Sequence, residues 1–305
     1  MRVAFAGSPE AAVAPLRALV AGGHDVTVVV TQPDKARGRS GRPSPTPVAA
    51  AAEVLGIRVL RPRTINDPAV IEEIAGSGAE ALAVVAFGQI LRDAVLSRWP
   101  SINVHFSLLP AYRGAAPVER AIMDGATETG VTIMQMDAGL DTGPMLAARR
   151  VEIGDDEDAG SLTARLSELG GPLLAEVLDD LGAGRLRPET QPEEGVSHAP
   201  KITAEDRALD LSGPAVALAR QVRALSPHVG ATLAIDGQPF KVWRARALPD
   251  AAPAPIVAGE GRLVAATGEG SLELLELQPP GRGRMEAASF LRGWRGPLEV
   301  GAAGG

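Results

Sequence analysis

Apolar, β-branched runs alternate with amphipathic stretches along the first half of the chain. Residues 3–6 and 26–31 have the composition of buried strands, and a helical pattern spans residues 9–21 between them. Further strands are expected at residues 58–60, 81–86, 102–106 and 132–136. Because alternating strands and helices pack as a mostly parallel sheet with helices on both faces, we expect a Rossmann-like α/β domain.

The turn after the first strand excludes one common use of this architecture. A dinucleotide-binding protein needs several glycines there, so that the backbone can approach the pyrophosphate. Residues 6–9 contain a single glycine, Gly7. The chain is therefore expected to have the Rossmann-like topology without an NAD site.

The second half of the chain has a different pattern. A long helix is predicted at residues 161–181, and residues 187–196, rich in Pro, Glu and Gly, are typical of a linker. Another helix is expected at residues 213–224. Short strands separated by Gly and Pro turns are expected after it, at residues 232–235, 240–245, 262–266 and 272–277. Such strands indicate a small β-barrel.

The length of the chain agrees with two domains, since 305 residues exceed a typical single domain. We predict an N-terminal domain at residues 1–188, a linker at 189–205 and a C-terminal domain at 206–305.

Composition excludes several kinds of site. Cysteine is absent, so disulfides, thiolate nucleophiles and cysteine-based metal sites are ruled out, and four scattered histidines show no paired metal-ligand spacing. A net charge of −7 argues against a general nucleic-acid binder, although residues 206–305 carry 11 basic against 10 acidic side chains. No apolar stretch reaches membrane-spanning length and the N-terminus has no signal-peptide pattern, so a cytoplasmic location is expected.

A polar pair, Asn103 and His105, lies on the predicted strand at residues 102–106. Because strand side chains alternate between faces, both should project from one face near the strand end. A neutral imidazole accepts a proton near pH 7, and a carboxamide donates two hydrogen bonds to an oxygen that gains negative charge. The pair therefore predicts a base next to an oxyanion donor.

Asp141 supplies the third group that such chemistry needs. It lies in a loop bracketed by Gly139 and Gly143, whose backbone freedom would let it fold back beside the imidazole. Base, oxyanion donor and charge partner suit acyl transfer. Taken singly, each residue has a simpler explanation, since Asn and His near strand ends often satisfy backbone groups and Asp in such loops often caps a turn.

Together with residues 129–137, Thr-Gly-Val-Thr-Ile-Met-Gln-Met-Asp, the three residues resemble the folate-dependent formyltransferase family. The resemblance extends along nearly the whole chain. Other segments that carry it are residues 2–9, 31–34, 85–91, 112–117 and 238–243.

The resemblance implies a donor, an acceptor and a role for each group. The donor would be 10-formyltetrahydrofolate, and the acceptor would be the α-amine of methionine on initiator Met-tRNA, which supplies formylmethionyl-tRNA for translation initiation. His105 would be the general base, Asn103 would hold the oxyanion, and Asp141 would orient and charge-balance the imidazole. The C-terminal domain would be an OB-like barrel that contacts tRNA, the protein a monomer, and no metal would be required.

The same resemblance places the folate pocket on three segments of the N-terminal domain. Backbone groups and apolar side chains would hold the pterin. The expected pocket residues are Phe87, Gly88, Gln89, Ile90, Leu91, Ser107, Leu108, Leu109, Pro110 and Asp137.

A basic loop at residues 35–47 carries four cations among Gly and Pro, and is too irregular to bury. Runs of charge are most often solvated surface, yet these suit phosphates or a nucleic-acid end. The resemblance implies that the loop closes over the tRNA acceptor end with Arg39 as its key arginine, so Arg39→Ala should weaken Met-tRNA use far more than folate binding. The expected tRNA-contacting residues are Lys35, Arg37, Arg39, Arg42 and Lys201.

The chain departs from the family pattern at two places. Phe106 follows the catalytic histidine where small residues are usual, and residues 226–229 lack a tryptophan often found there. Three alternatives stay open: a formyltransferase for sugar nucleotides or glycinamide ribonucleotide, a formyltetrahydrofolate hydrolase, and an RNA-binding protein built on a decayed Rossmann-like domain. The acceptor molecule separates them.

Overall fold

The computed structural model describes residues 1–36, 43–252, 254–294 and 298–301. The chain forms two compact units, each assembled from segments that are distant in sequence. Unit 1 comprises Met1–Gly114, Thr129–Val151 and Thr163–His198, and unit 2 comprises Ala115–Glu128, Glu152–Leu162 and Ala199–Gly305. These units are discontinuous, whereas the domains predicted from the sequence follow one another along the chain.

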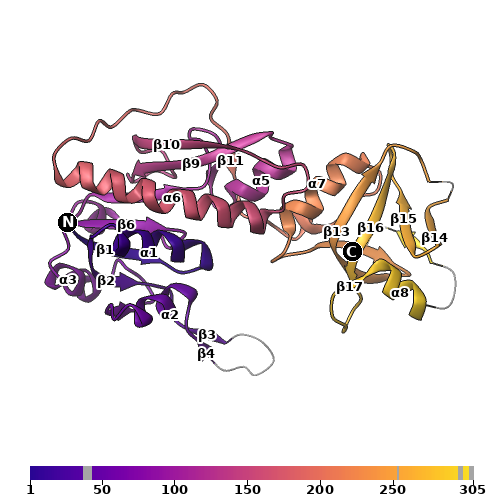
Figure 1. The fold of residues 1–305 in the computed structure, drawn as a ribbon, viewed down its shortest axis with the longest axis horizontal. Coiled ribbons are helices and arrows are strands. Elements are labelled where there is room, and N and C mark those ends of the chain that lie inside the picture. Colours follow the sequence, from indigo (N-terminus) through magenta and orange to yellow (C-terminus); the bar gives the residue numbers. More distant parts are fainter. Residues whose placement is uncertain (37–42, 253, 295–297, 302–305) are drawn as a thin grey trace. The chain divides into compact units, whose positions relative to one another are not determined.

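Unit 1 is built on a seven-stranded sheet with the order β10-β9-β7-β6-β1-β2-β5 (Figure 1). Neighbours from β7 through β6, β1 and β2 to β5 are parallel, and β9 is antiparallel to β7. The strands are β1 (Arg2–Gly7), β2 (Asp25–Val30), β5 (Val59–Leu60), β6 (Ala81–Val85), β7 (Ser101–His105), β9 (Glu128–Gln135) and β10 (Met145–Glu152). The predicted mostly parallel sheet is thus confirmed, while β10 was not expected.

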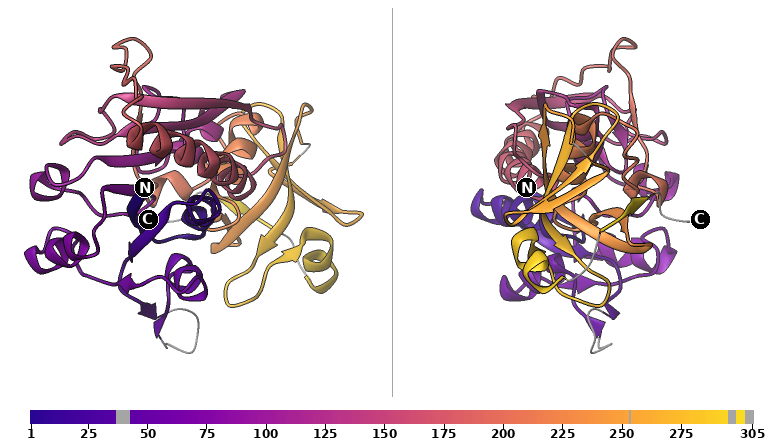
Figure 2. Two further views of the ribbon diagram at one scale, coloured as in Figure 1. Left: turned by 60° about the vertical axis from the view of Figure 1, so that its left-hand side comes forward. Right: turned by 90° about the vertical axis from the view of Figure 1, so that its right-hand side faces the viewer.

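Helices lie on both sides of this sheet (Figure 2), as the alternating pattern predicted. Strand side chains such as Val3, Phe5 and Val29 are fully buried between the layers. The helical elements are η1 (Glu10–Ala12), α1 (Val13–Ala21), α2 (Pro47–Val54), α3 (Pro68–Gly76), α4 (Asp93–Leu96) and α6 (Ala159–Gly182).

Helix α6 supports the strand that carries the predicted catalytic pair. Leu166 and Leu174 are fully buried along it. At Gly170 the helix backbone comes so close to β7 that a Cβ would lie 2.8 Å from a methyl carbon of Val104. Val104 stands between Asn103 and His105 and points to the opposite face, so the packing of α6 fixes the strand from behind.

The segment expected to be an irregular basic loop is ordered at its described ends. Residues Lys35–Ala36 form β3 and Pro43–Ser44 form β4, and the two pair antiparallel with Lys35 opposite Ser44. A second short pair joins β8 (Arg113–Gly114) to β11 (His198–Ala199). Strand β11 lies inside the stretch predicted as a linker, residues 189–205.

Unit 2 is centred on an antiparallel sheet with the order β14-β15-β16-β13-β12-β18, and β17 pairs with β16. No hydrogen-bonded pair closes this order among the described residues, as in a partly open barrel. Phe240, Leu274 and Phe290 belong to its core. Its strands and helices are α5 (Pro117–Asp124), η2 (Glu205–Arg207), α7 (Ala215–Leu225), β12 (Ala231–Ile235), β13 (Gln238–Leu248), β14 (Ile256–Gly259), β15 (Arg262–Ala266), β16 (Ser271–Gln278), β17 (Met285–Glu286), α8 (Ala287–Gly293) and β18 (Val300–Gly301).

The predicted C-terminal β-domain is therefore confirmed as an antiparallel sheet.

In the described part of the chain, none of the helices combines the length and the apolar composition that crossing a membrane requires.

Candidate active site

The imidazole of His105 is buried and held in one orientation. Its side chain is 5% exposed, and its Nε2 lies 2.9 Å from the carbonyl oxygen of Tyr112. A carbonyl oxygen can only accept, so Nε2 must carry the hydrogen, and Nδ1 of the neutral ring then carries the lone pair. The basic atom of His105 is therefore Nδ1.

Asn103 lies two residues earlier on the same strand and is half-buried. It pairs with Met134 of β9, and His105 pairs with Thr132, so both project from the same face of the sheet. Among the residues that the structure describes, none hydrogen-bonds to the carboxamide of Asn103. Its donors are thus available to a bound molecule.

Asp141 faces the basic nitrogen of the imidazole. Its Oδ2 lies 3.7 Å from Nδ1 of His105 and accepts a hydrogen bond from the backbone N–H of Gly114 at 2.8 Å. The first distance is too long for a hydrogen bond, and the contact is an ion pair only when the imidazole is protonated. The hydrogen bond that holds the ring comes from the carbonyl of Tyr112, and the predicted orienting role of Asp141 stays a prediction.

The loop that carries Asp141 has to fold back along the sheet. Gln135, the last residue of β9, pairs with Ile102 at the start of β7, so the loop leaves the sheet at the end away from His105. Gly143 gives it room, because a Cβ there would lie 1.9 Å from the carbonyl oxygen of Gln135. A Cβ at Gly139 would clash with a hydroxyl 2.0 Å away. These glycines provide space.

Backbone strain falls on residues other than these loop glycines. Asp141 itself has φ 54°, Tyr112 has φ 60° and Ala86 has φ 44°. Residues with a side chain keep the left-handed conformation only where their surroundings impose it, and such positions cluster at functional sites. All three lie in or next to the segments that were predicted to form the site.

Four of the predicted folate-pocket residues are turned into the protein. Phe87 and Leu91 are 2% and 5% exposed and belong to the core of unit 1, and Leu109 is buried as well. Ser107 is fully buried, and its hydroxyl donates to the carbonyl oxygen of Ala111 at 2.6 Å. These residues anchor the turns from which others reach the surface.

The remaining predicted pocket residues are accessible to different degrees. Ile90 is 83% exposed, Gly88 is exposed, and Leu108 and Pro110 are half-buried. Leu140, which was not predicted, is 64% exposed. Large apolar side chains this exposed offer surface to a ligand.

Two of the predicted polar pocket residues hydrogen-bond to other parts of the protein. The side-chain oxygen of Gln89 accepts from the N–H of Ile65 at 2.7 Å. Asp137 Oδ1 accepts from the N–H of Gly139 at 3.0 Å and from the hydroxyl of Thr142 at 2.8 Å, which braces the loop before Asp141.

Two glutamines that were not predicted hold the loops of the site. Gln32 Nε2 lies 3.2 Å from the carbonyl oxygens of both Phe87 and Gly88. Gln191 Nε2 lies 2.8 Å and 2.7 Å from the carbonyl oxygens of Asp141 and Gly143. Nothing in the local sequence marks either residue, because both contacts join segments about 50 residues apart.

Two of the five cations expected to contact tRNA lie among the residues that the structure describes. Lys35 is exposed, with its Nζ 3.4 Å from the side-chain oxygen of Gln32. Lys201 is exposed in unit 2. Arg37, Arg39 and Arg42 lie outside the described residues.

Both departures from the family pattern lie in well-packed surroundings. Phe106 is 8% exposed. Ser226 is buried in unit 2, and its hydroxyl donates to the carbonyl oxygen of Trp243 at 2.5 Å.

Metal ligands do not gather within the described ranges, where no three His, Cys, Asp or Glu side chains are placed to share an ion.

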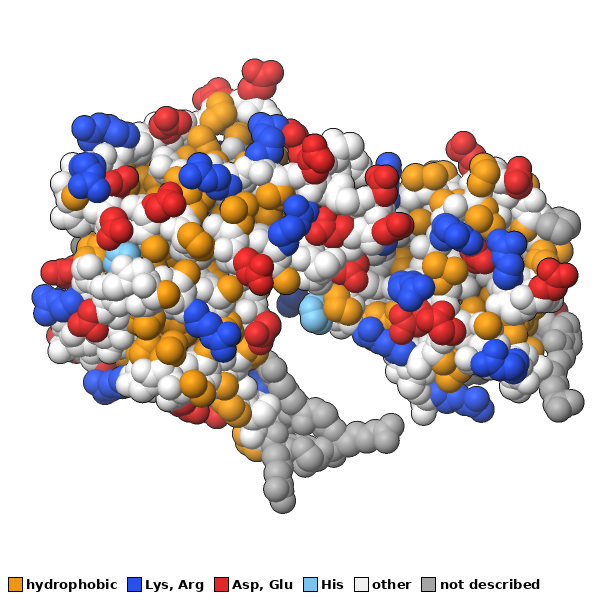
Figure 3. Space-filling view, viewed as in Figure 1, with side chains coloured by type: hydrophobic (Ala, Val, Ile, Leu, Met, Phe, Trp, Pro, Cys, Tyr) orange, Lys and Arg blue, Asp and Glu red, His pale blue; other side chains and the backbone are white. Residues whose placement is uncertain are grey.

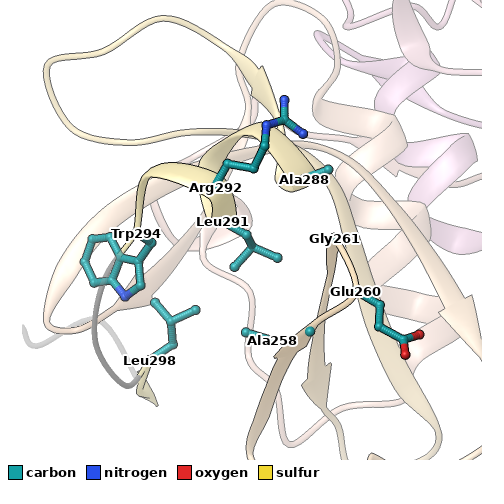
Figure 4. Close-up of a pocket in the computed structure, with 9 residues that line it drawn as sticks. Ala258, Glu260, Gly261, Ala288, Leu291, Arg292, Trp294 and Leu298 are labelled. Atoms are coloured by element: carbon teal, nitrogen blue, oxygen red, sulfur yellow. The ribbon is translucent and has the colours of Figure 1, made fainter.

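A separate cavity of about 520 Å³ lies in unit 2, beside α8 and the turn between β14 and β15. Figure 4 shows Trp294 and Leu298 on one side of it and Glu260 on the other. Its lining combines apolar side chains, such as Leu291, with the charged side chains of Glu260 and Arg292.

Comparison with known proteins connects both units to one family. Residues 1–178 match the family model described as "Formyl transferase", and residues 201–295 match "Formyl transferase, C-terminal domain". The methionyl-tRNA formyltransferase of Solibacter usitatus is 45% identical over 300 residues, which cover 97% of this chain and 96% of that protein. That of Methylococcus capsulatus is 44% identical over 296 residues, covering 95% and 96%.

Solved structures share the fold at lower identity. WlaRD, a sugar 3N-formyltransferase determined in the presence of dTDP and 5-N-formyl-THF, has a TM-score of 0.66 at 16% identity, covering 93% of this chain and 99% of its own. HypX from Aquifex aeolicus in complex with tetrahydrofolic acid has a TM-score of 0.68 at 17% identity, covering 95% and 47%. Such identities show a common fold.

Proposed function

Because the chain belongs to the formyl transferase family, we propose that it transfers the formyl group of 10-formyltetrahydrofolate to the α-amino group of methionine on initiator Met-tRNA. The observation that carries the proposal is one buried strand that presents an unengaged carboxamide and an imidazole of fixed orientation, with a carboxylate facing the basic nitrogen. Relatives named for this activity align over nearly the whole chain, including unit 2.

His105 is assigned to the proton that the acceptor must lose. The α-ammonium group of methionine becomes a nucleophile only when a base removes a proton, and Nδ1 of His105 carries the available lone pair. The carboxylate of Asp141, 3.7 Å from the same nitrogen, stabilises the positive charge that the ring then gains.

Asn103 is assigned to the formyl oxygen. When the amine attacks the formyl carbon, the carbonyl electron pair moves to that oxygen, and the carboxamide N–H stabilises the negative charge. Collapse re-forms the carbonyl and breaks the bond between carbon and N10. N10 takes up the second proton that the attacking nitrogen loses, so the products are formylmethionyl-tRNA and tetrahydrofolate. The hydrogen bond from Asn103 is strongest when the negative charge on the formyl oxygen is largest. It therefore stabilises the transition state more than the bound substrate, which lowers the activation barrier.

The donor is assigned to the accessible surface of the predicted folate pocket. The exposed side chains of Ile90 and Leu140 and the half-buried Leu108 and Pro110 fit an apolar ring system. Backbone groups near Gly88, held by Gln32, suit its polar edge.

Initiator tRNA is assigned to the predicted basic loop and to unit 2. Exposed cations of unit 2 include Lys241, Arg244 and Arg284, and Figure 3 shows Lys and Arg side chains interspersed with acidic ones on its visible face. Lys241 and Arg284 stack on the ring of Trp243, at 5.1 Å and 3.3 Å from its centroid. Phosphate contacts from such groups position a nucleic acid. For Arg37, Arg39, Arg42 and Lys201 the proposal rests on the sequence.

We further infer a cytoplasmic monomer. The three catalytic side chains all belong to unit 1 of one chain, so the proposed site needs no second copy.

A single assay tests the proposed function. Purified protein is incubated with 10-formyltetrahydrofolate labelled in its formyl group and with charged initiator tRNA, and the label is expected in formylmethionyl-tRNA. Parallel reactions contain uncharged tRNA, glycinamide ribonucleotide or an amino-sugar nucleotide. Transfer to one of the other amines, formate release without any amine, or RNA binding without formyl transfer would each overturn the proposal.

A further inference from the structure

Gln191 is a buried polar residue in a stretch whose composition is typical of a linker. Its side chain is 7% exposed. Its nitrogen donates to the carbonyl oxygens of Asp141 and Gly143, and its oxygen accepts from Nε and Nη2 of Arg113 at 3.0 Å and 2.6 Å. A carboxamide has two donor hydrogens and two lone pairs, so all of its hydrogen-bonding capacity is used.

These four hydrogen bonds converge on the carboxylate of Asp141 by two routes. The nitrogen fixes the main chain at Asp141 and at Gly143, on both sides of the turn. The oxygen fixes the side chain of Arg113, whose neighbour Gly114 donates its N–H to Asp141 Oδ2. Both the backbone of the aspartate and the donor that holds its side chain are therefore tied to Gln191.

The segment around Gln191 is itself anchored. Glu189 and Met145 exchange two backbone hydrogen bonds of 2.8 Å, which attaches the segment to the start of β10. Ser197 accepts the N–H of Tyr112 at 2.8 Å with its hydroxyl and the N–H of Arg113 at 2.9 Å with its carbonyl oxygen. The segment thus also holds the residue whose carbonyl orients His105.

We propose that Gln191 is a positioning residue for formyl transfer, and the inference rests on the function proposed for this site. Asp141 makes no direct hydrogen bond to His105 at 3.7 Å, so the place of its charge is set by its backbone, which has φ 54°. Gln191 imposes this conformation and so holds the carboxylate opposite the imidazole before substrates bind.

The test uses two substitutions at Gln191 and a matched control. Gln191→Met keeps the volume and removes all four hydrogen bonds, whereas Gln191→Glu still accepts from Arg113 but turns an oxygen toward two carbonyls. Gln221 is the control, because its nitrogen also bridges two carbonyl oxygens, those of Asp206 and Ala208 at 2.9 Å each, but in unit 2.

We expect both Gln191 variants to lower kcat by about ten- to a hundredfold, the scale of a misplaced catalytic group, with KM for Met-tRNA nearly unchanged. Both Gln191→Met and Gln221→Met should lower the Tm by a few degrees. Gln221→Met should leave kcat unchanged. An effect on kcat no larger than that of the control, or a Gln191→Glu variant with normal kcat, would overturn the proposal.

A double-mutant cycle separates positioning from general stability. If Gln191 acts through Asp141, then Gln191→Met in an Asp141→Asn background should cost little further kcat, although it still lowers the Tm. Multiplied losses of kcat would show that Gln191 acts elsewhere.

One readout does not depend on the reaction. The chain has four histidines, so the ring signal of His105 can be assigned by NMR through a His105→Gln variant. At fixed pH it should shift in Gln191→Met and stay in place in Gln221→Met. A wild-type protein that fails to formylate Met-tRNA refutes the proposed function, whereas an unmoved His105 signal refutes the positioning role.

Discussion

Two carboxylates of unit 2, Asp206 and Glu273, are held in a different way from Asp141 of unit 1. In unit 2, Arg120 grips Asp206 with two hydrogen bonds of 2.7 Å and 2.6 Å, and Glu273 lies between Arg246 and Arg262. In unit 1, Asp141 accepts one backbone N–H and faces an imidazole. Guanidinium groups stay charged at every working pH, so the charges of Asp206 and Glu273 are balanced near neutral pH. The charge of Asp141 is left for the imidazole of His105, to which we assign the proton transfer.

The pKa values of Asp206 and Glu273 follow from this pairing. Hydrogen bonds from Arg120 hold the pKa of Asp206 well below its usual range. Those from Arg262, and then from Arg246, lower the pKa of Glu273 despite its burial. These ion pairs therefore stabilise the fold and stay out of proton transfer near neutral pH.

Left-handed backbone conformations also have different causes in the two units. In unit 2, Asp236 and Glu260 have φ 50° and 51°, and each precedes a glycine in a two-residue hairpin turn. Such turns require this conformation at both central positions, so local sequence explains it. Asp141 in unit 1 has no such turn, and contacts from distant segments impose its conformation. The difference separates residues that serve the fold from residues that serve the site.

The largest effect expected is on the oxyanion donor. Asn103→Ala should lower kcat by about a hundredfold or more, because the charge on the formyl oxygen loses its hydrogen bond. Steady-state formylation of Met-tRNA measures it, with folding checked by circular dichroism. His105→Ala should fall to a similar level, and near-normal turnover in either variant would show that the assigned roles are wrong.

Charge removal at two aspartates tests the comparison directly. Asp141→Asn keeps an oxygen for the N–H of Gly114 but removes the charge opposite His105, and we expect kcat to fall by about ten- to a hundredfold. Asp206→Asn should leave kcat unchanged. Equal effects on kcat would erase the distinction between the two carboxylates.

Asp206 should make unit 2 sensitive to acid. Its pKa is lowered in the folded state, so its ion pair contributes stability above the usual carboxyl pKa of about 3.9 and loses that contribution as pH falls below it. Asp206→Asn should reduce the free energy of unfolding by about 1–3 kcal/mol at pH 7, as for a charge-assisted hydrogen bond. Denaturant titrations should show the difference between wild type and variant narrowing from pH 5 to pH 3, and a difference independent of pH contradicts the assignment.

The smallest effect is expected at a hairpin glycine of unit 2. Gly237 has φ 68° and open space where a Cβ would lie, so Gly237→Ala should cost about 1 kcal/mol of backbone strain and leave kcat unchanged. Gly143→Ala is the counterpart in unit 1, because its Cβ would collide with a carbonyl oxygen and displace the loop of Asp141. Calorimetry measures the stability of both variants, and steady-state assays measure their kcat. A Gly143→Ala variant with normal kcat would contradict the expected difference between the two glycines.

Local patterns were sufficient for much of the fold. Strands β1, β2 and β6 were predicted because each is a buried apolar run, and β7 because its apolar and polar residues alternate. Strand β10 was missed because Met145–Glu152 is mostly exposed and carries no such signal. The reversal of direction at β9 was missed too, since strand composition does not encode pairing partners.

The candidate site was predictable in its residue types but not in its supports. Asn103, His105 and Asp141 are close in sequence or marked by glycines. The carbonyl of Tyr112 is a main-chain group that any residue could supply, and the carboxamide of Gln191 reaches a segment about 50 residues away. Burial also redistributed the pocket, because Phe87 and Leu91 became anchors while Ile90 stayed exposed.

The return of the chain after α6 matters for anyone who divides this protein. A fragment cut at residue 188, where the sequence suggests a boundary, would retain all three reacting side chains but lack Gln191 and Ser197. Such a fragment would contain every strand of the seven-stranded sheet and still be a poor catalyst. Extending it through residue 199 would preserve the brace, so the useful place to cut lies past the short β11 pairing and not at the change in composition.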